Sequence, residues 1–175
     1  DNFTIQVSQE DCHTAIEDYL VEQLGDVGKK IHTARSRNDQ VLTALRPYYK
    51  EALQKIIDLG ESWIKVLGKF GEENYDVSFP GYTHMQKAMP SSMVMWAGAY
   101  ADGMKDDLSM LKSVAKLIDQ SPLGSAAGYG VHIKIDKEMT AKEMGFDRVQ
   151  KNPIYCQISR GKFELSILHG LGQIM

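Results

Sequence analysis

Residues 41–70 of this chain read VLTALRPYYKEALQKIIDLGESWIKVLGKF, and their apolar side chains recur every three or four positions. This spacing is typical of one face of an α-helix and predicts a single helix from about Asn38 to Glu72. At 1.5 Å per residue that helix would be about 50 Å long, too long for a compact α/β domain of this size. Pro47 should kink the helix or remove one of its hydrogen bonds. The predicted apolar face consists of Val41, Leu45, Tyr48, Ala52, Ile56, Leu59, Trp63, Val66 and Phe70.

A second segment, from Pro90 to Ile118, has the same rhythm. Pro90 fits the first position of a helix, where its missing N–H group would be unpaired in any case. Residues 74–89, between the two long helices, are predicted to be a loop. The apolar positions of the second helix are Met93, Ala97, Tyr100, Met104, Leu108, Leu111, Ala115 and Ile118.

Shorter helices are predicted on either side. Residues 8–11 resemble a capping box ahead of a helix that ends near Gly25. Another helix is expected near Lys137–Met144, and a last one from about Tyr155 or Gln157, with Phe163, Ile167, Gly170 and Ile174 on one face. Residues 122–135 are predicted to be a loop, and only 78–82 or 132–135 could be briefly extended. We therefore expect an all-α protein, one helical domain over residues 1–175, built as an elongated bundle of long helices.

Composition narrows the possible partners. The net charge of −3 argues against a nucleic-acid binder, which should carry a basic face. No apolar run approaches the roughly 18 residues needed to span a bilayer, and the amino terminus has no signal-peptide pattern. Cys12 and Cys156 have no metal-ligand or disulfide spacing, so a reducing cytoplasm is the simplest setting. We expect no metal and no cofactor, because no ligand cluster, Walker A loop or GxGxxG motif is present.

Three polar clusters occur at the predicted helix ends. The first is the run GKKIHTARSRNDQ at residues 28–40, just before the first long helix. A helix amino end offers free N–H groups and a positive dipole, and Arg matches a carboxylate with its rigid fork. This pattern predicts a site for a carboxylate-rich ligand, with an ordinary capped helix start as the alternative. The second and third clusters are residues 81–87 and the Gly-rich loop 122–130, whose backbone N–H groups could hold a carboxylate or simply form a turn.

His84 is the best candidate for acid–base chemistry, because imidazole titrates near neutral pH. Thr83 and Gln86 flank it and could hold the imidazole or a substrate. The alternative is a purely structural histidine. His13, with Glu17 one helical turn later, adds a fourth polar point.

Four stretches in order resemble landmarks of the argininosuccinate lyase family. Residues 33–41, TARSRNDQV, resemble its first signature, and residues 80–90, PGYTHMQKAMP, resemble its second at a fitting distance. Residues 122–125, PLGS, resemble a third landmark. Asp11-Cys12-His13 with Glu17 resembles the His-bearing helix before the first signature.

The resemblance implies the fumarase/aspartase fold, a homotetramer whose core bundle takes long helices from all four subunits. It also implies the reaction, the reversible elimination of fumarate from the small-molecule substrate argininosuccinate to release arginine. A base removes a proton beside a carboxylate, and an acid protonates the departing guanidinium nitrogen. Groups that hold the extra negative charge supply much of the acceleration.

The resemblance also implies residue roles. Ser36, Arg37 and Asn38 would bind the substrate's carboxylate and backbone groups, and Thr83 would contact the succinyl part. His84 would be the acid or a charge-stabilising partner. The remaining expected contacts are His13, which would line the site, and Gln86, a substrate or supporting contact.

The family's base is a serine on a mobile loop that this chain does not contain. We expect that loop beyond Met175, with a further amino-terminal part and a carboxy-terminal domain also missing, so the segment alone should be inactive. In the family each active site combines different subunits, so Arg37 and His84 of one chain should not meet.

Two stretches depart from the family pattern. The third landmark continues as Ala126-Ala127-Gly128-Tyr129 instead of Gly-Ala-Leu, and a familiar Ser-Asp-Arg-Asp-Phe stretch is reduced to SRGKF at residues 159–163, which leaves the role of Arg160 open. Three alternatives remain. The chain could come from a sister lyase acting on adenylosuccinate, from a non-catalytic crystallin-like protein on the same scaffold, or from a plain helical oligomerisation module.

Overall fold

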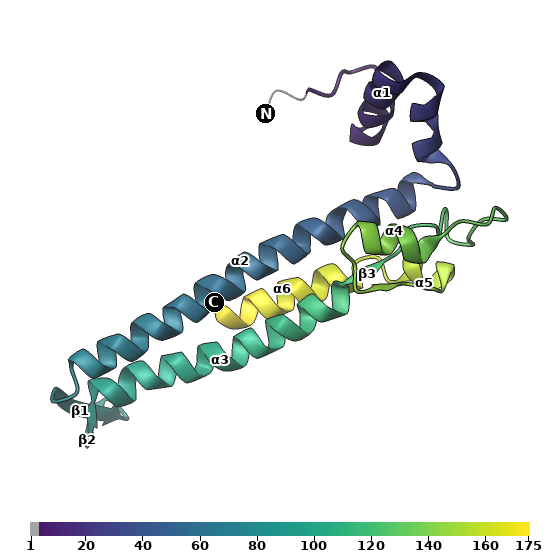
Figure 1. Ribbon diagram of the computed structural model, residues 1–175. Helices are drawn as coiled ribbons and strands as arrows, with labels where there is room; N and C mark the ends of the chain where they lie inside the picture. Colours follow the sequence, from purple (N-terminus) through teal and green to yellow (C-terminus); the bar gives the residue numbers. More distant parts are fainter. Residues whose placement is uncertain (1–3) are drawn as a thin grey trace. The chain divides into compact units, whose positions relative to one another are not determined.

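A computed structural model describes residues 4–175, and the all-α prediction is confirmed (Figure 1). The helices are α1 (Cys12–Leu24), α2 (Arg37–Glu73), α3 (Met93–Ile118), α4 (Lys137–Glu143), α5 (Pro153–Ile158) and α6 (Lys162–Ile174), with a 3₁₀ helix η1 (Gly25–His32) after α1. The strands are β1 (Ser78–Thr83), β2 (Gln86–Ser92), β3 (Gln120–Ser121) and β4 (Arg148–Val149). Among these described residues, no helix is long and apolar enough to cross a membrane.

The chain divides into two compact units. The first contains the residues up to Arg46 together with Gln120–Arg160, and the second contains Pro47–Asp119 together with Gly161–Met175. α2 contributes its amino-terminal end to the first unit and the remainder to the second, and it continues through Pro47 without a break. That one domain spans residues 1–175 stays a prediction.

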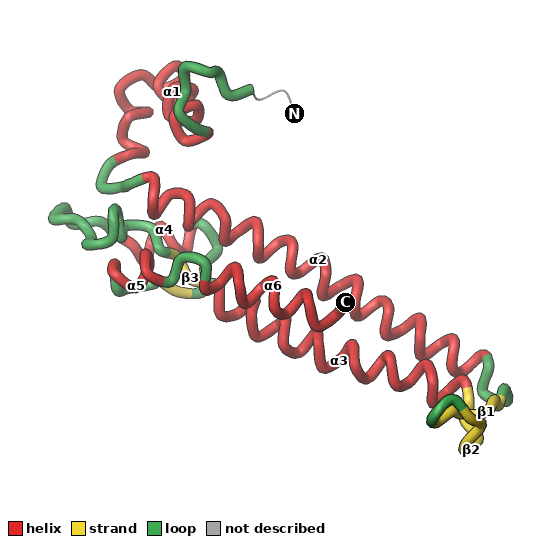
Figure 2. The backbone as a smooth tube through the Cα atoms, turned by 180° about the vertical axis from the view of Figure 1, so that it is seen from behind, coloured by secondary structure: helices red, strands yellow, loops and turns green. Residues whose placement is uncertain are grey.

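The second unit is a helical bundle. α3 and α6 lie side by side in both Figure 1 and Figure 2, and α2 runs along α3. Glycine allows two of these close approaches, because a Cβ on Gly60 would lie 2.7 Å from Leu108 Cδ2 and a Cβ on Gly170 would lie 2.7 Å from Leu111 Cδ2. The core side chains of this unit include Leu53, Ile57, Leu108, Leu111, Ile118, Phe163 and Ile167, all buried.

The predicted apolar face of α2 is the wrong one for the core of this chain. Leu59 and Trp63 are 70% and 49% exposed, while Leu53 and Ile57 are buried. α2 carries apolar residues on more than one stripe, and only the stripe with Leu53 and Ile57 packs inside the chain. Periodicity identifies a stripe without telling which neighbour covers it.

The predicted loop at 74–89 is also wrong in part, because β1 and β2 form an antiparallel hairpin there. The possible strand at 78–82 is confirmed, whereas residues 132–135 form none. Pro90 lies in β2 instead of starting a helix, and Ser92 caps α3 by accepting the Met95 N–H at 3.2 Å. Pro80 pairs with Pro90, and since neither has an N–H group, neither can donate across the ladder.

The helix boundaries need three further corrections. α1 is capped by Asp11, not by Ser8, and the last predicted helix is two helices, α5 and α6. Gly161, with φ of +82°, separates them. β3 and β4 form a short parallel pair that the sequence did not indicate.

Asp11 caps α1 by accepting the N–H groups of His13 at 2.9 Å and Thr14 at 3.0 Å. The Thr14 N–H is the main reason that the pKa of Asp11 lies below its ordinary value. The nearby charge of Arg37 and the N–H of His13 lower it further, against partial desolvation of the carboxyl.

We predict that truncating Leu111 to Ala destabilises the protein by about 2–5 kcal/mol, because a fully buried leucine leaves a cavity. Denaturant unfolding measures the loss. Ser113→Ala, an exposed change on the same helix, is the control and should stay within about 0.5 kcal/mol. Equal effects of the two changes would contradict the packing described.

A second prediction concerns pH. Because the pKa of Asp11 is lower in the folded protein, its cap should stabilise α1 above the ordinary value of 3.8 and be lost as pH falls through the lowered value. Hydrogen exchange of the His13 and Thr14 amides, followed from pH 7 downward, should show this transition. In Asp11→Asn, which keeps a capping oxygen but does not titrate, the transition should disappear; its persistence would assign it to another group.

Candidate functional site

The predicted site residues fall into both units. His13, Ser36, Arg37 and Asn38 belong to the first unit, and Thr83, His84 and Gln86 belong to the second. The expectation that Arg37 and His84 of one chain do not meet stays a prediction.

In the first unit, the start of α2 is closed by a reciprocal cap. The Ser36 hydroxyl accepts the Asn38 N–H at 3.3 Å, and Asp39 Oδ1 accepts the Ser36 N–H at 2.8 Å. This resembles a capping box with Asp three residues after Ser, except that the Ser36 hydroxyl accepts the N–H of the second helical residue and not of the third. The cap fixes the backbone on which Ser36, Arg37 and Asn38 sit.

Arg37 already binds a carboxylate, but one of this chain. Its Nη1 donates to Asp11 Oδ1 at 3.0 Å and its Nη2 to Thr14 Oγ1 at 2.8 Å, and Glu10 Oε2 lies 3.7 Å from Nε. The guanidinium fork thus ties α2 to the start of α1. Its binding of a substrate carboxylate stays a prediction.

Asn38 is exposed and has a neighbour from far along the chain. Arg160 Nη2 donates to both the backbone oxygen and Oδ1 of Asn38, each at 3.4 Å. Arg160 therefore adds a positive charge beside the cluster. The sequence left its role open because residues 159–163 depart from the family pattern, and its contact with Asn38, 122 positions away, gave no signal in the sequence.

The sequence offered two interpretations of the Gly-rich loop 122–130, a carboxylate-binding loop or a simple turn. Its backbone does hold a carboxylate, but that carboxylate is the side chain of Asp39. The N–H groups of Gly124 and Ala126 donate to Asp39 Oδ2 at 2.9 and 2.7 Å. Asp39 has no exposed surface. Sequence reasoning missed it as a functional candidate, although an acid in the third position of a capping box was a usable signal.

His13 lies half-buried on α1, and Glu17, one helical turn later, is engaged elsewhere. Glu17 Oε1 lies 2.7 Å from His32 Nδ1 instead of pairing with His13. The role of His13 in lining a site stays a prediction.

In the second unit, the candidate residues occupy the exposed tip of the β1–β2 hairpin. His84 and Met85 form its two-residue turn with φ of +51° and +62°, the conformation of a type I′ turn. Thr83 and Gln86 pair across the ladder on either side. The turn thus brings Thr83, His84 and Gln86 together and presents them to solvent.

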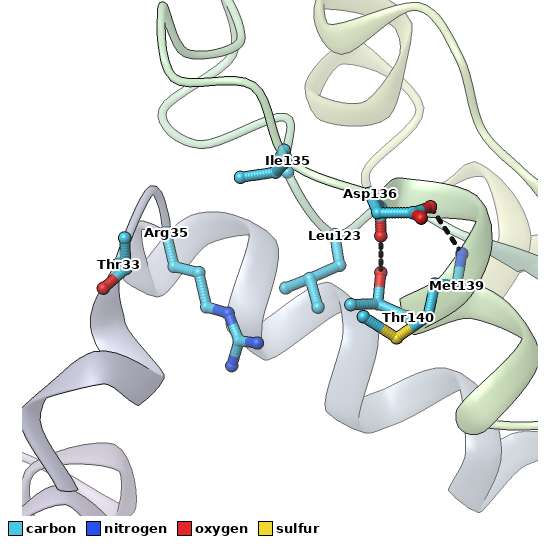
Figure 3. Close-up of a pocket in the computed structure, with 8 residues that line it drawn as sticks. Thr33, Arg35, Leu123, Ile135, Asp136, Met139 and Thr140 are labelled. Carbon is cyan, nitrogen blue, oxygen red and sulfur yellow. Dashed lines mark hydrogen bonds between the residues drawn. The ribbon is translucent and has the colours of Figure 1, made fainter. Parts of the chain in front are cut away.

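A pocket of about 200 Å³ lies in the first unit beside the α2 start (Figure 3). Arg35 offers it a positive charge, and Asp136 is occupied in capping α4 through the Met139 N–H at 2.8 Å. It is lined by Thr33, Arg35, Leu123, Gly124, Ile135, Asp136, Met139 and Thr140. Within residues 4–175, no group of three or more His, Cys, Asp or Glu side chains is placed to hold a metal ion.

Several argininosuccinate lyases are similar to this chain over nearly its whole length. The argininosuccinate lyase of Thermotoga neapolitana is 59% identical over 172 residues, which cover 98% of this chain and 43% of that protein. The argininosuccinate lyase of Xanthomonas campestris is 46% identical over 170 residues, covering 97% of this chain and 39% of that protein. The chain therefore spans about two fifths of the length of these relatives.

A solved structure confirms the fold. EDDS lyase in complex with formate matches 90% of this chain and 33% of its own, with a TM-score of 0.76 and 22% identity. At that identity the match supports the helical-bundle fold alone. A family model described as "Lyase" matches residues 1–170, so the chain belongs to this family of lyases.

Proposed function

We propose that this chain is the central part of an argininosuccinate lyase that releases fumarate and arginine from argininosuccinate. The observation that carries the proposal is the 59% identity with a relative of that name across 98% of this chain. The start of α2 supports it, since Arg37 already binds a carboxylate and Arg160 adds a second positive charge. The rest of the lyase, including its amino-terminal part, serine loop and carboxy-terminal domain, would lie outside these residues.

The reaction breaks one carbon–nitrogen bond. A base removes a proton from the carbon beside a substrate carboxylate, the electron pair forms the double bond of fumarate, and the guanidinium nitrogen leaves with a proton from an acid. Ser36, Arg37 and Asn38 would hold the carboxylate as its negative charge increases, and His13 would line the site. Thr83 would contact the succinyl part, and Gln86 would support it. His84 would supply the proton or stabilise charge, and its place at an exposed turn leaves the imidazole free to reach a substrate.

Self-association into a homotetramer is part of the same proposal. The second unit has an apolar groove of about 550 Å³. In it Trp96 packs edge-on against Phe70 and Tyr100, with ring centroids 6.5 and 4.9 Å apart. Apolar patches of this kind mark protein interfaces. The groove is lined by Trp63, Val66, Leu67, Phe70, Trp96 and Tyr100.

In such an assembly, each active site would combine the α2 start of one chain with the His84 hairpin of another. We further propose a cytoplasmic location. Cys12 and Cys156 are both free thiols in the structure, as suits a reducing compartment.

The first test assays the full-length protein for fumarate release by ultraviolet absorbance, with argininosuccinate and adenylosuccinate in parallel. We expect activity on argininosuccinate alone, and His84→Asn should lower kcat by about 10²–10⁴-fold. Asn tolerates positive φ, so this change removes the imidazole without straining the turn. His132→Asn, in an exposed loop, is the control and should keep full activity.

The other outcomes reject the proposal. Activity on adenylosuccinate alone would identify the sister lyase. No activity on either substrate from a folded tetramer would favour the crystallin-like, non-catalytic alternative.

A second test measures the assembly by analytical ultracentrifugation. Val66→Lys places a charge in the apolar groove and should convert tetramers into smaller species. Ser109→Lys, an exposed polar position on α3, is the control and should leave the tetramer intact. A tetramer that survives Val66→Lys would place the interface on another surface.

A further inference from the structure

Asp39 lies beneath the candidate carboxylate-binding cluster without being part of it. We propose that Asp39 is a positioning residue that holds the start of α2 and the loop 122–130 in one arrangement, so that Ser36 and Asn38 can meet a substrate carboxylate. The inference rests on the proposed function, because it assigns Asp39 a part in that site. Asp39 would act through its neighbours and would not itself touch substrate.

The two oxygens of Asp39 bind different segments. Oδ1 accepts the Ser36 N–H at 2.8 Å, whereas Oδ2 accepts the N–H groups of Gly124 and Ala126 at 2.9 and 2.7 Å. The side chain is completely buried, so water cannot substitute for any of these donors. One carboxylate therefore fixes both segments together.

The loop is shaped to make this contact. Gly124 has φ of +90° and Ala126 has φ of +51°, and residues in such conformations turn their N–H groups into an anion-binding concavity. The positive φ of Gly124 favours glycine, and a Cβ there would lie 2.7 Å from Ile135 Cδ1, so a larger residue would be strained and would displace that side chain. Ala126 keeps a conformation that disfavours side chains, which indicates that the Asp39 contact holds it.

A second side chain, that of Gln157, also holds this loop in place. Gln157 Nε2 donates to Ser125 Oγ and to the Ala126 carbonyl oxygen, each at 3.3 Å. Gln157 lies three positions before Arg160, whose guanidinium donates to Asn38. The loop is therefore linked to Asn38 through Gln157 and Arg160, and a shift of the loop would displace Asn38.

Asp39→Asn tests the role because an amide cannot reproduce the carboxylate. Only one of its two polar atoms is an acceptor, so the NH₂ group must face either the Ser36 N–H or the two loop N–H groups. Either orientation breaks one of the two attachments while leaving the size of the side chain unchanged.

The experiment measures kcat/KM for argininosuccinate in the full-length protein for Asp39→Asn, Asn38→Ala and the double variant. We expect Asp39→Asn to lower kcat/KM by about 20-fold or more. The kcat/KM of the double variant should be no more than about twofold below that of the less active single variant, because the effects of residues that act through one another are not additive. The amides of Gly124 and Ala126 should also exchange faster in Asp39→Asn.

Thr43→Val is the matched control. It removes the bond from Thr43 Oγ1 to the Asp39 carbonyl oxygen, 2.7 Å long, at a buried site on the same helix, but leaves the carboxylate untouched. It should leave kcat/KM within about twofold of the wild type. Should Asp39→Asn fail to assemble, Gln157→Ala replaces it in the same cycle, and a non-additive loss with Asn38→Ala is again expected.

Three results would overturn the inference: an Asp39→Asn protein within twofold of wild type, losses that multiply in the double variant, or an equal loss in Thr43→Val. Multiplying losses with Asn38→Ala in the Gln157→Ala cycle would do so as well. An inactive wild type would instead reject the proposed function. In that case hydrogen exchange still tests the contact: if the Gly124 and Ala126 amides exchange at the same rate in Asp39→Asn as in the wild type, Asp39 does not hold the loop.

Discussion

The first unit depends on two charged side chains of α2 that are buried and hydrogen-bonded to segments far along the chain. Asp39 binds the backbone of Gly124 and Ala126, and Arg46 donates to the Gln120 carbonyl oxygen and, at 2.7 Å, to Gln150 Oε1. A buried charge left without partners costs far more than its bonds contribute, so these contacts determine where residues 120–150 can lie. Gln150 extends this network to α5, because its Nε2 donates to Ser159 Oγ at 3.1 Å and its backbone carbonyl oxygen accepts the Cys156 thiol at 3.3 Å. Burial raises the pKa of that thiol, which keeps it a neutral donor.

The fold was predictable wherever one local pattern decided the structure. The three-four rhythm predicted α2 and α3 closely, and it predicted the buried side of α6, because 3.6 residues per turn place residues three and four positions apart on one face of a helix. It failed where the outcome depended on a partner. Leu59 and Leu53 are equally apolar, and only the packing of other helices decides which of them is covered. The second strand of the hairpin was missed because Pro90 fits the start of a helix, and the pairing that places Pro80 opposite Pro90 is not encoded in either stretch alone.

The sequence allowed us to predict which residue types gather at the candidate site, but not which partners those residues bind. The residue types at the start of α2 indicated a carboxylate site, and the structure shows carboxylates bound there, those of Asp11 and Asp39. Which carboxylate each donor holds could not be deduced, since the bond from Gly124 to Asp39 spans 85 positions and the one from Arg160 to Asn38 spans 122. Spacing within a motif says nothing about such partners, and for the same reason Asp39 was overlooked although it stood inside the quoted signature.

Division into two units bears on how such a site can be completed. The second unit carries both the His84 hairpin and the apolar groove of Trp63, Phe70 and Trp96, and β2 leads directly into α3, on which Trp96 lies. Any surface that covers the groove therefore also fixes the place of the hairpin relative to that surface. The first unit, in contrast, holds its donors in place by its own buried charges. In the proposed assembly, self-association would bring this pre-ordered set of carboxylate-binding donors to an imidazole positioned by the interface, so that assembly and catalytic competence would arise in the same step.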